Sequence, residues 1–284
     1  MKLYAVETGF FKLDGGAMFG VVPKSMWNKL NPADENNLCT WALRCLLIED
    51  DGRIILVDNG IGDKQDPKFF SNYHLHGNDS LDLSLEKIGF DKEDITDVIL
   101  THLHFDHCGG SIIKKGDALI PAFPNATFWS NERHWKWATN PNDREKASFL
   151  KENILPIEAS GKLEMIAVKE NGLTDFTKNI SMRFAFGHTE AMMLPQIRNA
   201  GKTIVFMADL LPSAAHIPIP YVMAYDMFPL TTLMEKKSFL KEAAENEYIL
   251  VFEHDPSIEC CTVHETEKGI RMKESFSLAS LMDD

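Results

Sequence analysis

Residues 101–107 read Thr-His-Leu-His-Phe-Asp-His, which puts three histidines and one aspartate within six positions of a 284-residue chain. The preceding residues 95–100 form a short, apolar and β-branched run, which predicts a buried strand. The Cys-Gly-Gly of residues 108–110 ends regular structure. We therefore expect this cluster in a turn at the carboxyl end of a strand, where sheet-based folds place their chemistry.

Imidazole and carboxylate groups together suit a borderline divalent metal such as zinc. On an extended segment His102 and His104 point to the same side, so both can reach one ion. If the chain then turns into a helix after Phe105, Asp106 and His107 can face a second position. The alternative is a polar turn with incidental histidines. Because the whole chain has ten histidines, three within six positions favour a metal motif.

Three further candidate ligands follow β-like runs. His188 comes after a run that begins near residue 180, Asp209 ends the apolar run of residues 203–208, and His254 follows the apolar run of residues 248–252. Each is a weak signal alone, because a single histidine after a strand is more often a hydrogen-bonded core or loop residue. Their combination with the cluster at residues 102–107 is much more specific.

The series His102-x-His104-x-Asp106-His107, followed by residues 188, 209 and 254, resembles the metallo-β-lactamase superfamily. This resemblance implies an α/β fold, the four-layer αββα metallo-β-lactamase sandwich, as a single domain over residues 1–284. It also implies a dinuclear metal site at one edge of the sandwich. The ions would be zinc, with manganese, iron or cobalt as alternatives.

The resemblance carries over to individual residues. It assigns one metal to His102, His104 and His188, the other metal to Asp106, His107 and His254, and a bridging position to Asp209. The segment Leu56-Val-Asp58-Asn-Gly60 resembles the aspartate turn of this family. Asp58 would then hold ligand histidines through their free N–H groups.

Two longer segments resemble a narrower branch. Residues 13–24, Leu-Asp-Gly-Gly-Ala-Met-Phe-Gly-Val-Val-Pro-Lys, and residues 207–212, Met-Ala-Asp-Leu-Leu-Pro, are similar to the quorum-quenching N-acyl-homoserine lactone lactonases. In that branch a metal-bridging hydroxide opens the lactone ring, and Asp106 and Asp209 would orient it. Pro212 stands where known lactonases carry a tyrosine, so His216 or Tyr221 is the candidate for polarising the carbonyl. A structural role is the alternative for His216.

The resemblance leaves other activities open. The same site could hydrolyse an organophosphate triester, another carboxylic ester or a thioester, and a non-catalytic metal-binding protein is an alternative of a different class. Residues 17–23 and 217–223 are apolar candidates for a wall around an acyl chain. Loop packing or a contact between two copies in a homodimer would explain the same segments.

The composition of the chain limits the classes of binding partner that we expect. The formal net charge of −13 argues against nucleic acid, which needs a basic face, and it is compatible with the small lactone or ester substrate that the resemblance implies. The lysine pairs at residues 114–115 and 236–237 are expected on solvated faces. Five cysteines without a CxxC pair indicate reduced thiols in a cytoplasmic protein. No signal peptide or membrane span is expected, because no apolar run is long enough.

Several elements outside the site can be predicted from pattern. Strands are expected at residues 3–12, at 42–58 with a turn at 50–52, and at 125–129. Helices are expected at residues 81–88, from 130 through Trp135 and Trp137, from about 148, and at 230–245. The two tryptophans are expected in the core or at an interface. Cys108 is expected to be a packed small residue, with a thiolate ligand as the alternative.

Overall fold

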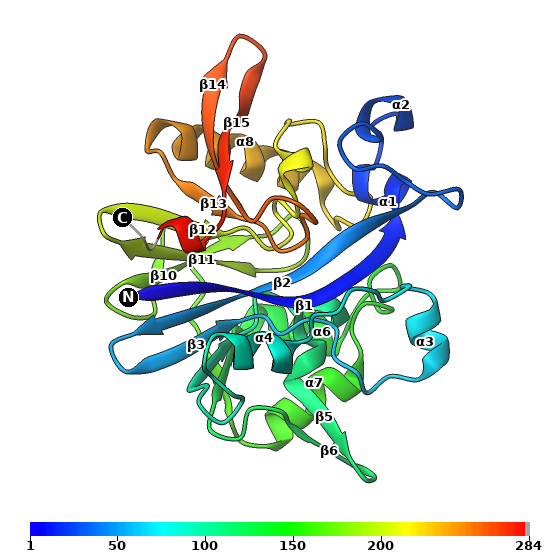
Figure 1. Cartoon of the computed structure of the whole chain (residues 1–284), viewed down its shortest axis with the longest axis vertical. Helices are drawn as coiled ribbons and strands as arrows, with labels where there is room; N and C mark the ends of the chain where they lie inside the picture. The colour runs from blue at the N-terminus through cyan, green and yellow to red at the C-terminus, as the bar shows by residue number, and fades with distance from the viewer. Residues whose placement is uncertain (282–284) are drawn as a thin grey trace.

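The computed structural model describes residues 1–281, which form two β-sheets packed face to face with helices on both outer sides (Figure 1). The first sheet has six strands in the order β1-β2-β3-β4-β7-β8. Its strands are β1 Lys2–Asp14, β2 Leu38–Asp50, β3 Arg53–Val57, β4 Asp97–Ile99, β7 Thr127–Ser130 and β8 Leu163–Met165. Strands β3, β4, β7 and β8 pair in parallel, whereas β1, β2 and β3 are antiparallel neighbours.

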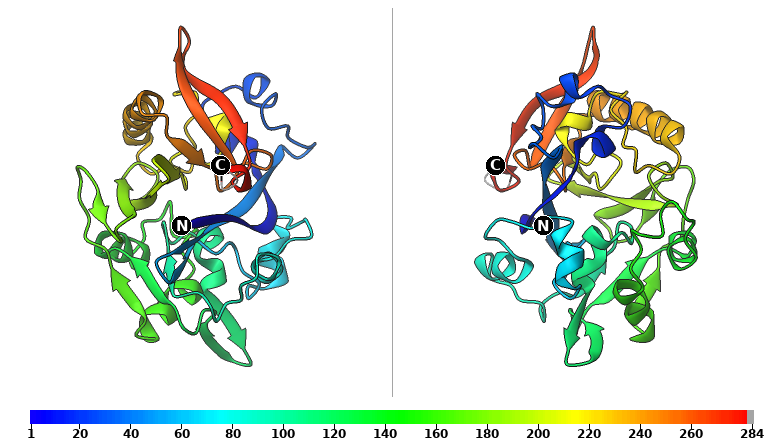
Figure 2. Two further views of the ribbon diagram at one scale, coloured as in Figure 1. Left: turned by 60° about the vertical axis from the view of Figure 1, so that its left-hand side comes forward. Right: turned by 90° about the vertical axis from the view of Figure 1, so that its right-hand side faces the viewer.

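The second sheet has seven strands in the order β15-β14-β13-β12-β11-β10-β9. Its strands are β9 Thr174–Asp175, β10 Ile180–Ala185, β11 Met192–Asn199, β12 Lys202–Phe206, β13 Ile249–Val251, β14 Cys260–Thr266 and β15 Gly269–Phe276. Only β12 and β13 pair in parallel. The hairpin of β14 and β15 extends away from the body of the molecule (Figure 2), and β5 Ile112–Lys115 and β6 Ala118–Pro121 form a separate hairpin.

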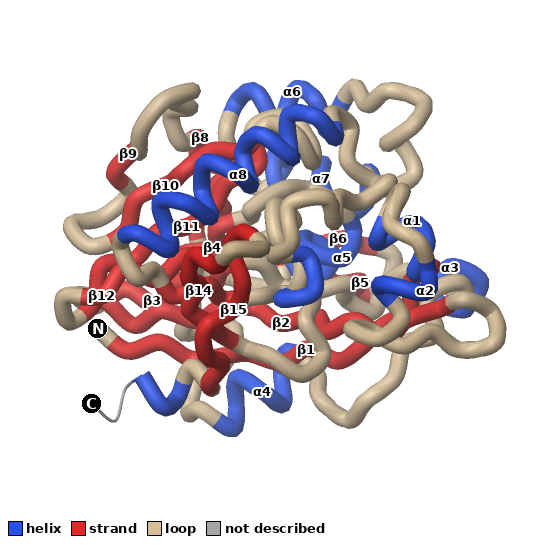
Figure 3. Tube along the Cα trace, turned by 90° about the horizontal axis from the view of Figure 1, so that it is seen from above, coloured by secondary structure: helices blue, strands red, loops and turns tan. Residues whose placement is uncertain are grey.

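The helices of the first half are α1 Gly15–Phe19, α2 Lys24–Trp27, α3 Pro67–Ser71, α4 Leu81–Lys87, α5 Phe105–Cys108, α6 Glu132–Thr139 and α7 Lys151–Ala159. Helices α4, α6 and α7 cover the outer face of the first sheet, and α1, α2 and α3 lie toward one end of its strands (Figure 1). Helix α8, Pro229–Glu245, lies across the second sheet (Figure 3). Short 3-10 turns occupy Gly109–Ser111, Ala214–His216 and Ala279–Leu281. Within residues 1–281, no helix is both long and apolar enough to cross a bilayer.

The alternation of side chains along β2 explains the layering. Leu46 and Ile48 point into a core shared with Met182 and Leu194 of the second sheet. Leu47 points the other way, into a core under the helices α4, α6 and α7. The strand is buried on both faces, as expected for the middle of a layered α/β sandwich. The four-layer αββα arrangement predicted from the sequence is therefore confirmed.

Most predicted elements are confirmed within a few residues, including the helical turn that begins after His104. The helix expected from residue 148 begins only at Lys151, because residues 143–148 form turns. The predicted exposure of Lys236 is wrong, since this side chain is 1% exposed and donates hydrogen bonds to the carbonyls of Pro218, Ile219 and Tyr221. The prediction was wrong because these three backbone carbonyls accept the hydrogen bonds of the Lys236 amino group and so allow it to be buried.

The cysteines agree with the sequence analysis. All five are buried and unpaired. Cys108 packs in the core beneath the first sheet, and its thiol faces the carbonyl oxygen of Leu103 at 3.4 Å. Trp135 is 6% exposed and lies in the same core, as predicted.

Candidate metal centre

The histidine-rich segment lies in the connection between β4 and α5. The chain is extended through His104, which is the N-cap of the α5 turn with φ −65° and ψ 152°. The extended part turns the imidazoles of His102 and His104 toward one point, and α5 turns Asp106 and His107 toward a neighbouring point. All four residues are buried. The change from extended to helical backbone thus separates one short segment into two pairs of candidate ligands.

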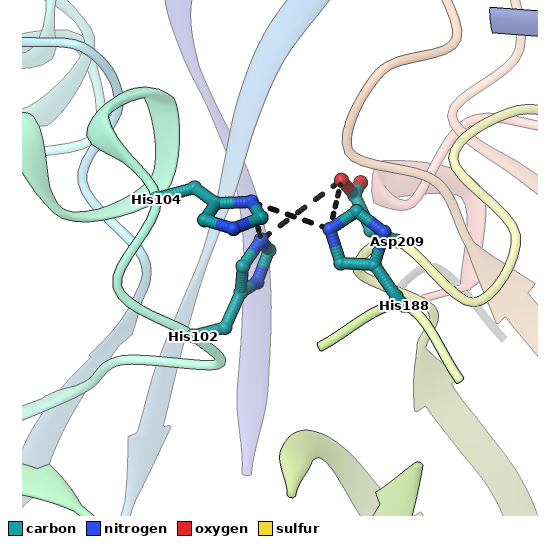
Figure 4. A group of neighbouring side chains, drawn as sticks. All are labelled: His102, His104, His188 and Asp209. Atoms are coloured by element: carbon teal, nitrogen blue, oxygen red, sulfur yellow. Dashed lines mark hydrogen bonds and ion pairs between the residues drawn. The ribbon is translucent and has the colours of Figure 1, made fainter. Parts of the chain in front are cut away.

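The first group comprises His102, His104, His188 and Asp209 (Figure 4), with one ligand atom from each residue within 4.8 Å of the others. His102 Nε2 lies 3.1 Å from His104 Nδ1, and His188 Nε2 lies 3.3 Å from the same atom. The carboxylate of Asp209 approaches His188 Nε2 at 3.1 Å. Residues from three separate segments therefore converge on one point.

The second group comprises Asp106, His107 and His254. His254 Nε2 lies 3.2 Å from His107 Nε2, and Asp106 Oδ2 lies 3.8 Å from each of these nitrogens. Asp209 faces both groups, because its Oδ1 is 3.2 Å from His254 Nε2 while its Oδ2 is 3.1 Å from His188 Nε2. The structure thus brings together all seven residues that the sequence analysis assigned as metal ligands.

The outer nitrogens of three histidines contact strong acceptors. His104 Nε2 faces Glu145 at 2.9 Å, His188 Nδ1 faces Asp226 at 2.8 Å, and His254 Nδ1 faces the carbonyl oxygen of Ala42 at 2.8 Å. A carboxylate or carbonyl oxygen only accepts, so each of these nitrogens must carry the proton. In a neutral imidazole the inner nitrogen then presents a lone pair to the centre.

The two other histidines follow the same rule through Asp58. The Thr101 hydroxyl donates to Asp58 Oδ2 at 2.6 Å, so its oxygen can only accept from His102 Nδ1, 3.1 Å away. His107 Nδ1 donates to Asp58 Oδ2 at 3.1 Å. The prediction that Asp58 holds a histidine of the cluster is confirmed for His107. When the five imidazoles are neutral, their inner lone pairs face one another in a buried space, and this donor set fits divalent cations.

The carboxylates of the cluster favour positive charge on His188 and His254, whereas burial lowers the pKa of His102 and of His104. Burial lowers the pKa of His254, but the carboxylate of Asp209 outweighs it and raises that pKa to about 9. The pKa of His188 is likewise raised, because Asp209 and Asp226 overcome the effect of burial. Burial raises the pKa of Asp209, yet His188, His254 and His107 hold it well below its ordinary value. Carboxylates that stabilise protonated histidines here would stabilise a bound cation in the same way.

Two buried acids near the cluster were not expected from the sequence. Glu253 Oε2 lies 2.9 Å from His107 Nδ1, and burial raises the pKa of this carboxyl to about 8 against the attraction of His107. Glu145 accepts from Trp137 Nε1 at 2.6 Å as well as facing His104. Although burial opposes it, the hydrogen bond with His104 lowers the pKa of Glu145 to about 2. The one signal in the sequence was that Glu253 adjoins His254.

A cavity of about 400 Å³ opens onto both groups. Its lining combines candidate ligands with apolar and aromatic side chains, as is usual for sites that bind small molecules. Besides His104, Asp106, His188, Asp209 and His254, it is lined by Leu13, Ala17, Met18, Tyr73, Phe105, Arg144, Glu145, Ala147, Ser148, Ala224, Tyr225 and Met227.

The cavity wall differs in part from the predicted one. Residues 17–23 contribute Ala17 and Met18, whereas residues 217–223 contribute nothing, and residues 224–227 take their place. Tyr221 and His216 do not line the cavity. The ring of His216 stacks on Phe19 at 4.7 Å, and its nitrogens contact the Ser213 hydroxyl at 2.8 Å and the Met18 carbonyl at 2.9 Å. This placement corresponds to the structural alternative for His216.

Comparison with known proteins agrees with this fold and site. The model of the metallo-beta-lactamase superfamily matches residues 44–254. An N-acyl homoserine lactonase from Bacillus cereus is 28% identical over 165 residues, which cover 55% of this chain and 56% of the relative. The chain thus spans about half the length of the curated relatives it matches.

Solved structures match over almost the whole chain. A probable metal-dependent hydrolase from Staphylococcus aureus superposes with a TM-score of 0.86 at 27% identity, covering 97% of this chain and 98% of that one. The dizinc quorum-quenching lactonase AidC superposes with a TM-score of 0.78 at 21% identity, covering 97% and 95%, and shows the shared fold.

The fold and the paired groups of histidines and aspartates agree with the metallo-beta-lactamase superfamily. The chain belongs to that superfamily.

Proposed function

We propose that this chain hydrolyses a lactone of the N-acyl-homoserine lactone type with the help of two divalent metal ions. The observation that carries the proposal is the convergence of seven buried ligand atoms in two groups that share the carboxylate of Asp209. The similarity to N-acyl homoserine lactonases supports the substrate class. The apolar lining of the 400 Å³ cavity supports an acyl compound.

We assign the first ion to His102, His104 and His188, the second to Asp106, His107 and His254, and both ions to Asp209. Zinc suits this set of imidazole and carboxylate ligands, and manganese, iron and cobalt are alternatives. When bound, such ions lower the pKa of a coordinated water toward neutrality and polarise a carbonyl oxygen.

The residues of the chain orient the reacting groups. Glu145, Asp226 and Asp58 fix the rotation of His104, His188 and His107 through their outer nitrogens. Asp106 lines the cavity, and its Oδ2 faces the second group. We assign to the Asp106 carboxylate the transfer of a proton from the attacking water to the ring oxygen of the lactone, which leaves as the acyl C–O bond breaks.

Three broader features belong to the same proposal. We assign residues 1–284 to one domain, and a core between the sheets that draws on strands from both halves of the described chain supports this assignment. The unpaired cysteines support a reducing compartment such as the cytoplasm. A role in quorum quenching is proposed from the lactonase relatives, and a homodimer stays a prediction.

The test compares an acyl-homoserine lactone, a phosphotriester and a thioester as substrates of the zinc-loaded protein. We expect the lactone to have the highest kcat/KM. His104→Ala should lose both zinc and activity, whereas His264→Ala, an exposed histidine on β14, should lose neither. If the phosphotriester or the thioester is hydrolysed and the lactone is not, the assignment of a lactone substrate is rejected, but the proposal that the protein is a hydrolase stands. Unchanged zinc content in His104→Ala would reject the metal site.

A further inference from the structure

Arg144 is the only lysine or arginine among the residues that line the cavity. The other ionisable lining residues are histidines, tyrosines and carboxylates. Arg144 is exposed and lies in the turns of residues 143–148 that precede α7. The Arg144 guanidinium is thus a permanent positive charge at the cavity of a chain whose net charge is −13.

No carboxylate neutralises this guanidinium within residues 1–281. Its neighbours in sequence are engaged elsewhere, since Asp143 pairs with Lys146 at 2.8 Å and Glu145 accepts from Trp137 at 2.6 Å. The guanidinium donates to the backbone carbonyl of Ala224. Because a guanidinium has five N–H donors, most of its capacity is left for a ligand.

The contact with Ala224 fixes Arg144 at the rim. Ala224 lines the cavity, and Asp226, the partner of His188, lies two residues further along the same segment. The hydrogen bond therefore joins the turn at residue 144 to the segment whose Asp226 contacts a candidate metal ligand. A group bound by Arg144 would share the cavity with a substrate whose reacting carbon lies at the histidines.

Two tyrosines add donors to the same cavity. The hydroxyls of Tyr73 and Tyr225 form no hydrogen bond with any residue in the described part of the chain, and both side chains line the cavity. Burial raises the pKa of each to about 12, so both stay protonated near neutral pH. Unlike these hydroxyls, Arg144 can form two parallel hydrogen bonds to a carboxylate.

We propose that Arg144 is the specificity residue of this site, and that the substrate is an acyl lactone whose acyl chain ends in a carboxylate. This inference rests on the proposed lactonase function and adds the charged end of the substrate. The methylene groups between the two ends would contact the apolar wall formed by Leu13, Ala17 and Met18.

The test uses N-glutaryl-homoserine lactone and its methyl ester, which differ by one charge. The zinc-loaded native protein should prefer the charged lactone by roughly tenfold in kcat/KM, mainly through KM, as one charge-assisted contact predicts. Added salt should reduce that preference. Arg144→Gln should raise KM for the charged lactone about tenfold more than for the ester, and Arg144→Lys should lie between. Lys151→Gln, an exposed change at the start of α7 that releases no carboxylate next to Arg144, should leave the preference unchanged.

Binding is measured separately by calorimetry with N-cyclopentylglutaramic acid and its methyl ester, which have no lactone to hydrolyse. We expect the acid to bind more tightly, and Arg144→Gln to remove the difference. Equal binding of acid and ester by the native protein, or an equal loss for both in Arg144→Gln, would overturn the inference. If neither lactone is hydrolysed, the proposed function fails, and these binding affinities alone decide whether Arg144 selects a carboxylate.

Discussion

Replacing Asp226 by asparagine removes one charge from behind His188 and keeps the shape of the side chain. Asp226 Oδ1 lies 2.8 Å from His188 Nδ1, and both residues are 1% exposed. The second oxygen, Oδ2, is buried without a hydrogen-bond partner. In the variant, the amide would either turn an N–H toward His188 or leave its NH₂ group buried without an acceptor.

The size of the effect follows from this environment. A buried hydrogen bond to a charged group contributes about 1.5–3 kcal/mol, and 1.4 kcal/mol corresponds to a factor of ten in affinity. We therefore expect Asp226→Asn to weaken zinc binding about 10- to 100-fold, in the range usual for partners behind a ligand histidine. The assay is competition for zinc with a chromophoric chelator at fixed pH and ionic strength.

Two controls accompany the Asp226 measurement. Asp51→Asn changes the same atoms at an exposed turn with φ 49°, a conformation that asparagine tolerates, and should leave zinc affinity unchanged. The melting temperature of each metal-free variant shows whether it is folded. A folded Asp226→Asn protein with native zinc affinity would refute the role of Asp226 in orienting His188.

Three further predictions concern stability. Burial raises the pKa of the Asp97 carboxyl, but the hydrogen bond from Arg53 lowers it below its ordinary value. The stabilisation from this pair should be complete above the unfolded pKa of about 3.9 and should disappear as the pH falls through the folded pKa. The difference in urea unfolding free energy between the native protein and Asp97→Asn should therefore shrink in acid. A difference that is constant from pH 7 to pH 3 would contradict this. Leu194→Ala, at 0% exposure between the sheets, should cost about 2–5 kcal/mol of unfolding free energy, whereas Leu230→Ala, at 76% exposure, should be nearly neutral; similar losses would contradict the assigned core. Gly187→Ala would place a Cβ 2.2 Å from the backbone nitrogen of Thr232, so we expect a lower melting temperature and weaker zinc binding, and a native-like variant would show that α8 does not approach so closely.

The sequence was most informative where the ligands are contiguous. His102, His104, Asp106 and His107 share one turn, so the change from extended to helical backbone was enough to predict two facing pairs. His188, Asp209 and His254 were weak candidates from their positions after β-like runs, and their order in the family pattern made their assignment specific. Their positions at strand ends of the second sheet explain why one edge of the sandwich collects them.

Asp58 was predicted as a partner of the candidate ligands, but the other acids behind them were not. Glu145 and Asp226 are separated from their histidine partners by 41 and 38 positions, and nothing in local pattern distinguishes a buried acid from a surface one. Lys236 was misplaced for the same reason, since its acceptors are loop carbonyls 15 to 18 positions away. The predicted cavity wall at residues 217–223 was replaced in the structure by residues from 224–227, because the conformation of this loop depends on such distant contacts.

Anomalous diffraction at the zinc absorption edge would test the paired site most directly. We predict two peaks per chain about 3.5–4 Å apart, the usual separation in two-metal sites. One should contact His102, His104 and His188, the other Asp106, His107 and His254, with Asp209 touching both. A single peak, or zinc bound away from these side chains, would contradict the shared centre.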